Sequence, residues 1–209
     1  MRRLHLGGKV RVAGWELMNV VPSPEVDHVG DARDLSRFAE ASFDELYASH
    51  LLEHFDYRDE LAQTLREWWR VLIPGGFLRI SVPDMEVLAH LLLEIPKDRQ
   101  AERFALTRML FGGHVDAWDY HKVGFTQDML AWFLLATGYA DVSRVADFGL
   151  FDDTSSMRFL GVPISLNMVA VKPLPANDVP RVDLARISCI CGNGRRFLDC
   201  HGHARTQPG

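Results

Sequence analysis

The residues best suited to bind a metal ion stand near the end of the chain, where Cys189, Cys191, Cys200 and His201 form a Cys-x-Cys-x8-Cys-His pattern. Thiolate sulfur and imidazole nitrogen are the ligands with which proteins surround zinc tetrahedrally. Gly192–Gly194 supplies the turn between the two halves of the pattern. Four protein ligands leave no open coordination position, so we predict a structural zinc site. The alternative is a set of free thiols. A disulfide framework is disfavoured because the chain's 3 cysteines are odd in number and clustered.

A second group of reactive side chains lies in Ser49–His54, which reads Ser-His-Leu-Leu-Glu-His. Taken alone, His50-x-x-Glu53-His54 matches the inverted zinc-protease pattern, in which two histidines one helical turn apart hold the metal. The apolar run Phe43–Ser49 leads directly into this group and is typical of a buried strand, which argues against a protease helix. His50 then either faces a ligand or forms a simple hydrogen bond at the strand end. Ligands of open α/β sheets bind at the carboxyl edge, which favours the first interpretation.

A third group occupies the glycine-flanked segment 111–125, which contains His114, Asp116, Trp118, Asp119 and His121. Loops of this kind carry function disproportionately often, so a lid over a pocket is one interpretation. The other is an ordinary solvated loop in which Trp118 fills a gap.

The elements that must position these groups begin with a strand, a helix and a second strand. Phe43–Ser49 is the first strand, and Asp56 and Asp59 offer acceptors for the start of a helix. Leu61, Leu65, Trp68, Trp69 and Leu72 then form one apolar stripe on that helix. Pro74–Gly76 ends the helix, and Phe77–Val82 is the second strand. A crossover of this length joins parallel strands, so we predict an α/β fold.

These residues also carry a family resemblance. FDELYASHLLEHF (residues 43–55) followed by REWWRVLIPGGFLRISVPD (residues 66–84) resembles the region of the fourth and fifth strands in class I S-adenosylmethionine-dependent methyltransferases. The resemblance implies a Rossmann-like, seven-stranded, mostly parallel sheet with helices on both faces, spanning residues 1–173. It also implies S-adenosylmethionine as the cofactor. It does not identify the methyl acceptor.

The resemblance assigns roles to particular residues of this chain. Gly7 and Gly8 correspond to what remains of the glycine loop that approaches the methionine part of the cofactor. Asp31, in Gly-Asp-Ala-Arg-Asp-Leu, corresponds to the aspartate beside the adenine amino group; the alternative is that Asp31 or Asp34 caps a short helix over 36–41. His50 is expected to face the cofactor. Where the acceptor must lose a proton, His50 or His121 is the candidate base.

Two departures from the family pattern support a second hypothesis. Only six residues separate Gly8 from Trp15, where the next strand begins, so the usual helix between them is missing or reduced to a loop. No carboxylate follows that strand to bind the ribose, although Asn19 or Glu25 could replace it. The alternative is therefore a non-catalytic methyltransferase-like adaptor with a degenerate cofactor loop. A nicotinamide dehydrogenase is disfavoured because the chain has no Gly-x-Gly-x-x-Gly motif.

The rest of the chain continues the α/β pattern and then changes character. Helices are expected to open at Asp84 and end before Pro96, and to cover 99–110 and 126–137; the last two strands are expected over 142–148 and 164–171, paired antiparallel. A proline-rich linker covers 174–185. Residues 186–209 resemble the SEC-C motif, a zinc-binding tail that docks onto partner proteins. That resemblance makes Arg195, Arg196 and Arg205 candidate contact residues.

Composition limits the remaining possibilities. The 209 residues are 47% hydrophobic and 24% charged, which is typical of a soluble globular protein. A net charge of −5 makes nucleic acid an unlikely partner in general. No apolar run is long enough for a signal peptide or a membrane span, so a cytoplasmic location is the expectation.

Overall fold

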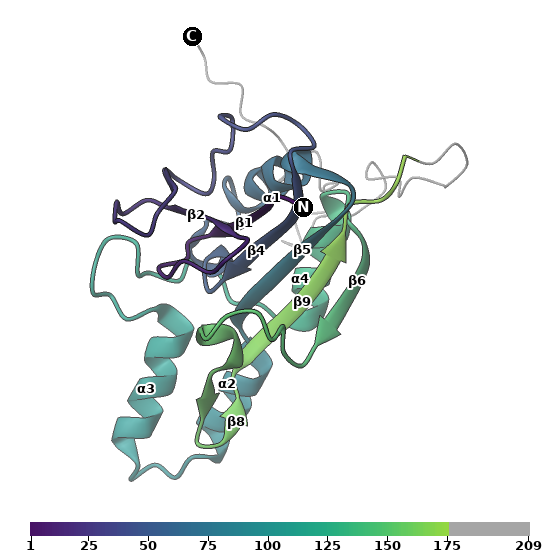
Figure 1. Cartoon of the computed structure of the whole chain (residues 1–209). Coiled ribbons are helices and arrows are strands. Elements are labelled where there is room, and N and C mark those ends of the chain that lie inside the picture. Colours follow the sequence, from purple (N-terminus) through teal and green to yellow (C-terminus); the bar gives the residue numbers. More distant parts are fainter. Residues whose placement is uncertain (176–209) are drawn as a thin grey trace.

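The computed structural model describes residues 1–175, which are built around a seven-stranded sheet of order β3-β2-β1-β4-β5-β9-β6 (Figure 1). The pairs β1–β2, β1–β4, β2–β3 and β4–β5 are parallel, whereas β9 is antiparallel to both β5 and β6. The bounds of these strands are β1 Arg3–Leu6, β2 Glu16–Asn19, β3 His28–Val29, β4 Phe43–Ser49, β5 Leu72–Pro83, β6 Ala140–Val145 and β9 Ser165–Val171. The predicted α/β class and the antiparallel last pair are confirmed.

Four α-helices, two 3-10 turns and a small hairpin complete the described residues. They are η1 Leu52–His54, α1 Leu61–Val71, α2 Met85–Glu94, α3 Gln100–Phe111, α4 Gln127–Ala136, η2 Thr154–Ser156, β7 Arg158–Phe159 and β8 Val162–Pro163. None of these helices combines the length and the apolar character needed to cross a bilayer.

The main core lies between one face of the sheet and the helices α1 and α4. Side chains alternate between the two faces of a strand, and on this face they are apolar, as at Leu4, Leu46 and Ile80. They pack against buried residues of α1, such as Trp68, and of α4, such as Phe133. Both helices lie behind the sheet in Figure 1.

The opposite face of the sheet is more polar and is covered without an α-helix in the described residues. The Tyr47 hydroxyl donates to Asp153 Oδ2 at 2.8 Å, and Asn167 Nδ2 donates to the carbonyls of Ala146 and Ser155. The segment between β6 and β9 thus lies over this face. The prediction of helices on both faces is wrong for residues 1–175, because the connections 7–15 and 20–27 are too short to hold the helices of a second layer.

The unit β4–α1–β5 agrees with the prediction in its order and differs in how α1 begins and ends. Leu61, Leu65 and Trp68 are buried along α1, as the apolar stripe predicts. Asp56 does not cap the helix with its side chain: its backbone carbonyl accepts from the first amides, and its carboxylate accepts from Arg58 N. The helix stops at Val71, before Pro74–Gly76.

The helices after β5 begin where the sequence indicates. Asp84 Oδ1 accepts from Val87 N at the start of α2, and Thr126 Oγ1 accepts from Met129 N at the start of α4. α2 and α3 pack on each other in a second, smaller cluster that includes Leu88 and Leu106. In Figure 1 these two helices extend beyond the sheet edge at which β5 ends.

The N-terminal connections are loops. Residues 7–15 contain no helix, which confirms the expected loss of the first crossover helix. The short helix predicted over 36–41 is absent and turns replace it; Asp34 Oδ1 accepts from Ser36 N in one of them. The predicted zinc ligands Cys189, Cys191, Cys200 and His201 lie outside the described residues, as does the linker beyond residue 175.

Candidate functional site

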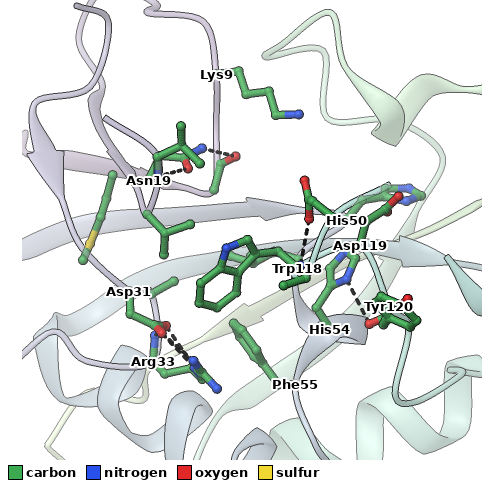
Figure 2. A pocket seen from close by; sticks show the side chains of 18 of the residues that line it. Lys9, Asn19, Asp31, Arg33, His50, His54, Phe55, Trp118, Asp119 and Tyr120 are labelled. Carbon is green, nitrogen blue, oxygen red and sulfur yellow. Dashed lines mark hydrogen bonds and ion pairs between the residues drawn. The ribbon is translucent and has the colours of Figure 1, made fainter. Parts of the chain in front are cut away.

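A cavity of about 450 Å³ lies where β1, β2 and β4 end (Figure 2). Its wall comes from Gly7 after β1, from 18–21 at the end of β2, from 30–33 after β3, from residues of 50–55 after β4, and from 115–120 with Lys122. The volume is within the range of about 300–1,000 Å³ that is usual for small-molecule sites. The carboxyl edge of a parallel sheet is also where such sites are expected.

Of the two glycines predicted to line the site, only Gly7 does so. Gly7 has a φ of +77°, and a Cβ on it would lie 3.2 Å from two methyl carbons of Leu51. Gly8 is buried beneath the wall, where a Cβ would lie 2.4 Å from Leu17 Cδ1 and 2.6 Å from the His5 ring. The lack of a side chain at Gly7 therefore leaves room at the cavity wall, whereas at Gly8 it allows Leu17 and His5 to pack closely beneath that wall.

Asn19 holds the turn that Gly7 and Gly8 form. Its Nδ2 donates to the carbonyls of Gly7 at 3.1 Å and Gly8 at 2.8 Å, and its Oδ1 accepts from Val21 N at 2.9 Å. The amide is thus engaged by the chain itself, although Asn19 is part of the cavity wall. Glu25, the other residue considered for the ribose, is not part of that wall.

Asp31 is part of the wall as predicted, but its carboxylate is paired with Arg33. Arg33 Nη2 donates to Asp31 Oδ2 at 2.6 Å, and Arg33 Nε donates to Oδ1 at 3.0 Å. Burial alone would raise the pKa of Asp31, but the hydrogen bonds from Arg33 outweigh it and hold that pKa below its ordinary value. Arg33 also pairs with Glu60, which Lys122 Nζ contacts at 3.1 Å. This end of the cavity is a network of ion pairs.

His50 closes β4 in a conformation that is uncommon for its residue type. Its φ is +47°, and its amide donates to Ser81 O at 2.8 Å. The ring Nε2 lies 2.9 Å from Ser165 Oγ, whose own proton goes to Thr154 O at 2.7 Å. Ser165 can therefore only accept from His50, so Nε2 carries the proton in the neutral ring. His50 Nδ1 is left with a lone pair, 3.4 Å from Glu53 Oε1.

This arrangement bears on the predicted base function of His50. Burial lowers its pKa to about 4, with His121 nearby adding to the effect, so the ring is neutral at pH 7. A neutral imidazole accepts a proton only at its bare nitrogen, which here faces Glu53. His50 contributes to the cavity wall.

Glu53 lies behind the wall and is nearly sealed from solvent. Its side chain is 1% exposed, and neither carboxylate oxygen has a hydrogen-bond partner in residues 1–175. Burial raises the pKa of Glu53 to about 8. His121 Nε2 lies 3.9 Å from Glu53 Oε1, and the rings of His54 and His121 are 4.8 Å apart. Glu53, His54 and His121 together place one ligand atom each within 4.8 Å of one another.

The structure brings His121, the second predicted base, to this group and not to the cavity, whose wall it does not join. Burial lowers the pKa of His121 to about 4, and the neighbouring His54 adds to the effect. The protease pattern is not supported, because Leu52–His54 forms one 3-10 turn and not a helix that could present two histidines on one face.

The glycine-flanked segment forms the outer wall of the cavity, which agrees with the lid interpretation. Figure 2 shows the Trp118 indole projecting into the middle of the cavity, between Asp31 on one side and His54 on the other. The segment is anchored where Lys122 N donates to Glu53 O at 2.8 Å. Trp118 is itself exposed, so its side chain does not fill a gap in the core.

Sequence reasoning missed Arg33 and the isolation of Glu53. Arg33 stands two residues after Asp31, and a basic residue at that spacing is a signal that the aspartate has a partner. No sequence signal distinguishes Glu53 from an exposed glutamate, because its burial depends on the loop from 112 to 123 folding over it.

Comparisons with known proteins agree with this geometry. A family model described as a methyltransferase domain matches residues 16–80, which is less than half of the chain. A methyltransferase structure from Archaeoglobus fulgidus is 16% identical with a TM-score of 0.54, covering 82% of this chain and 86% of that one. One from Methanosarcina mazei is 16% identical with a TM-score of 0.51, covering 83% and 92%. The chain has the fold of S-adenosylmethionine-dependent methyltransferases.

One further solved structure was determined with ligands. The 1,6-didemethyltoxoflavin-N1-methyltransferase of Burkholderia thailandensis, with bound 1,6-didemethyltoxoflavin and S-adenosylhomocysteine, is 18% identical with a TM-score of 0.50, covering 82% of this chain and 71% of that one. A search of curated proteins gave no match. At these identities the likeness establishes the fold, and the chemistry must be argued from the site.

Proposed function

We propose that this chain is an S-adenosylmethionine-dependent methyltransferase that uses the cavity at the ends of β1, β2 and β4. The observation that carries the proposal is Gly7, whose positive φ opens the cavity wall at the place where a Cβ would meet Leu51. Close approach of the backbone to a ligand is the usual reason for glycine after the first strand of such a fold. The Burkholderia enzyme, with S-adenosylhomocysteine bound, supports the same cofactor here.

The residues that line the cavity are suited to the parts of this cofactor. Gly7 leaves room at the end of β1, Asp31 offers carboxylate oxygens to an amino group, and Trp118 offers an aromatic face. When bound, S-adenosylmethionine supplies an electrophilic methyl group. The protein then mainly has to align an acceptor with it, and alignment can contribute about 7–11 kcal/mol to lowering the barrier. A residue that removes a proton is needed only for acceptors that must lose one.

Calorimetric titration of the full chain with S-adenosylhomocysteine tests the proposal, with NAD⁺ as a ligand that should give no heat. We expect saturable binding that Asp31→Asn weakens, because a carboxylate acceptor is lost. Asp34→Asn is the matched control, since Asp34 is exposed, close in sequence and outside the cavity wall. Absence of heat at millimolar ligand would contradict the proposal.

The non-catalytic adaptor remains the second candidate because a specific observation favours it. Arg33 donates to the Asp31 carboxylate, and the Asn19 amide donates to the carbonyls of Gly7 and Gly8. Two polar groups at this end of the cavity therefore already have partners in the chain. The adaptor hypothesis expects no binding in the same titration. Saturable binding with the expected effect of Asp31→Asn would favour the enzyme.

The C-terminal zinc site is a separate part of the proposal. Cys189, Cys191, Cys200 and His201 are proposed as the four ligands of a structural zinc ion in a tail that binds a partner protein. Elemental analysis of the purified chain should find zinc that a Cys189→Ser, Cys200→Ser variant loses. Zinc content unchanged by these substitutions would contradict the assignment.

A further inference from the structure

A buried group of metal-ligand side chains lies directly behind the cavity, in η1 and the segment that covers it. It consists of Glu53 and His54 from η1 and of His121 from the segment after α3. Their ligand atoms lie within 4.8 Å of one another although 67 positions of sequence separate His54 from His121. Neither the family resemblance nor the comparisons assign a function to this group.

Glu53 is the feature of this group that requires an explanation. A buried carboxylate normally accepts several hydrogen bonds, because leaving its oxygens unpaired in a dry environment is costly. Both oxygens of Glu53 lack a donor among residues 1–175, although the side chain is only 1% exposed. Two ring nitrogens lie near its Oε1: His50 Nδ1 at 3.4 Å and His121 Nε2 at 3.9 Å.

The hydrogen bonds of the histidines show that these rings present lone pairs as well. His50 donates from Nε2 to Ser165, which leaves Nδ1 bare. His54 Nδ1 lies 3.2 Å from Tyr120 O, and because a carbonyl only accepts, that nitrogen carries the proton and Nε2 is bare. Carboxylate oxygens and imidazole lone pairs therefore gather in one place without a donor. A proton on Glu53 would serve only one of these acceptors, whereas a metal ion serves several at once.

We propose that Glu53, His54 and His121 bind a divalent transition-metal ion such as zinc. Two imidazoles and one carboxylate form a recognised ligand set for zinc and for metals of similar preference. Bonds of about 2.0–2.2 Å to such an ion place ligand atoms about 3.4 Å apart in a tetrahedron. The observed separations of 3.9 Å and of at most 4.8 Å require only a small contraction.

The surroundings of these side chains agree with such a site. Ligating histidines usually donate their second ring nitrogen to a carbonyl or carboxylate, as His54 does to Tyr120 O. Three protein ligands leave one coordination position open. His54 belongs to the cavity wall, so an ion held by this group would lie next to the cavity. On the proposed function, which this last step assumes, the ion would hold an oxygen of the methyl acceptor.

Metal binding is tested on the full chain without cofactor or acceptor, so its failure does not depend on the proposed methyl transfer. The proposed zinc site of the tail must first be removed, so the titration uses a variant carrying Cys189→Ser, Cys191→Ser and Cys200→Ser, which has no thiolate ligand. Chelator-treated protein is titrated with Co²⁺ and followed by visible absorption. We expect one equivalent of bound Co²⁺ with ligand-field bands and without thiolate-to-cobalt charge transfer. Zinc should displace it.

Two substitutions locate the bound ion in this group. Glu53→Gln and His121→Ala should each weaken Co²⁺ binding by at least about 100-fold, since even partners outside the ligand set typically cost 10–100-fold. His114→Ala is the matched control, because His114 lies in the same segment, is exposed and is not part of the group. Circular dichroism confirms that each variant folds.

Two results would overturn the proposal. One is a folded cysteine-free chain that binds no Co²⁺ at all, which needs no further variant to interpret. The other is binding that Glu53→Gln and His121→Ala leave as tight as His114→Ala does.

Discussion

The Asn19 side-chain amide donates to the Gly8 carbonyl oxygen at 2.8 Å, which ties the end of β2 to the turn after β1. The same nitrogen donates to Gly7 O at 3.1 Å. In the family that the sequence resembles, a carboxylate after the second strand binds the cofactor ribose. Here the corresponding polar side chain shapes the loop itself, and a carboxylate in its place would face two carbonyl oxygens without a proton to donate.

The first prediction concerns this amide. Asn19→Ala should lower the free energy of unfolding by about 1.5–4.5 kcal/mol, because three hydrogen bonds of about 0.5–1.5 kcal/mol each are lost. It should also weaken S-adenosylhomocysteine binding by loosening the Gly7 turn. Asn19→Asp should destabilise the protein more than Asn19→Ala, because it adds repulsion. Urea denaturation and calorimetric titration measure the two effects.

Glu25→Gln is the control for this prediction, since Glu25 was the other candidate for the ribose and lies outside the cavity wall. It should leave both quantities unchanged. Tighter ligand binding in Asn19→Asp would mean that the ribose carboxylate matters more than the loop, contrary to our interpretation.

The second prediction separates two effects of a side chain at Gly7: the strain of its left-handed backbone conformation and the steric contact of the added Cβ with Leu51. Gly7→Ala should cost about 1–2 kcal/mol for a left-handed conformation with a side chain, and the new Cβ, 3.2 Å from Leu51 carbons, should also reduce ligand affinity. Gly149→Ala is matched to it: Gly149 has a φ of +61°, but nothing lies within 4 Å of the added Cβ. Thermal denaturation should show similar losses for both variants, while only Gly7→Ala should weaken binding. Equal affinity in the two would exclude Gly7 from the site.

The sequence predicted those parts of the fold whose signals are local. Phe43–Ser49 was predicted with its observed bounds, because a strand buried in the middle of a parallel sheet is a short run rich in apolar residues. Asp84 and Thr126 were placed at helix starts because capping depends on neighbouring residues. The second helical layer was predicted from the family resemblance and not from residues, and the short connections within residues 1–175 leave no room for it there.

The site was predicted less completely because its chemistry depends on contacts between distant segments. Gly7, Asp31 and His50 were correctly expected at the edge of the sheet, since each follows a parallel strand. Gly8 and His121 were expected at the cavity and lie outside its wall. The pairing of Asp31 with Arg33 and the isolation of Glu53 arise only when the chain packs, and no periodicity in the sequence indicates them.

The third prediction uses Trp118 as a reporter. Because its indole projects into the cavity, S-adenosylhomocysteine binding should change the protein's tryptophan fluorescence, and Trp118→Phe should abolish most of that change. Folding stability should stay within about 0.5 kcal/mol, since Trp118 is 54% exposed. Trp132→Phe is the control: Trp132 packs 4.9 Å from the Phe133 ring, away from the cavity wall. A signal that follows Trp132 would place the ligand elsewhere.

The fourth prediction is that Glu53 and Glu60 affect the pH dependence of the folding stability in opposite directions. Burial raises the pKa of Glu53 to about 8, so the folded protein holds a proton that the unfolded chain releases above pH 4.5. The stability that this proton provides is complete below pH 4.5 and is lost as the pH rises to 8, on the order of 4 kcal/mol. Glu53→Gln should therefore stabilise metal-free protein at pH 8 and should have little effect at pH 4.5.

Glu60 provides the opposite case with the same substitution. Burial would raise its pKa, but the Asp56 amide, Lys122 and Arg33 outweigh burial and lower it. A lowered pKa contributes stability that is present above the ordinary value and is lost as the pH falls, so Glu60→Gln should destabilise the protein at neutral pH. Urea denaturation from pH 4.5 to 8 would measure Glu53→Gln, and from pH 3 to 6 Glu60→Gln. A destabilisation by Glu60→Gln that does not shrink as the pH falls below 4.5, or a stabilisation by Glu53→Gln that does not grow as the pH rises, would contradict the assignment.

Zinc should remove the pH dependence that Glu53 causes. A metal ion binds the ionised carboxylate and neutral imidazoles, so its affinity rises as the ligands lose their protons. In the cysteine-free chain, stability should fall between pH 7 and 8 in the presence of a chelator, above the range in which the buried histidines titrate, and excess zinc should flatten that fall. Glu53→Gln should remove both the fall and its response to zinc, because it removes the titrating group and a ligand together. If zinc leaves the falling slope of the cysteine-free chain unchanged, the carboxylate is satisfied by a proton and not by a metal.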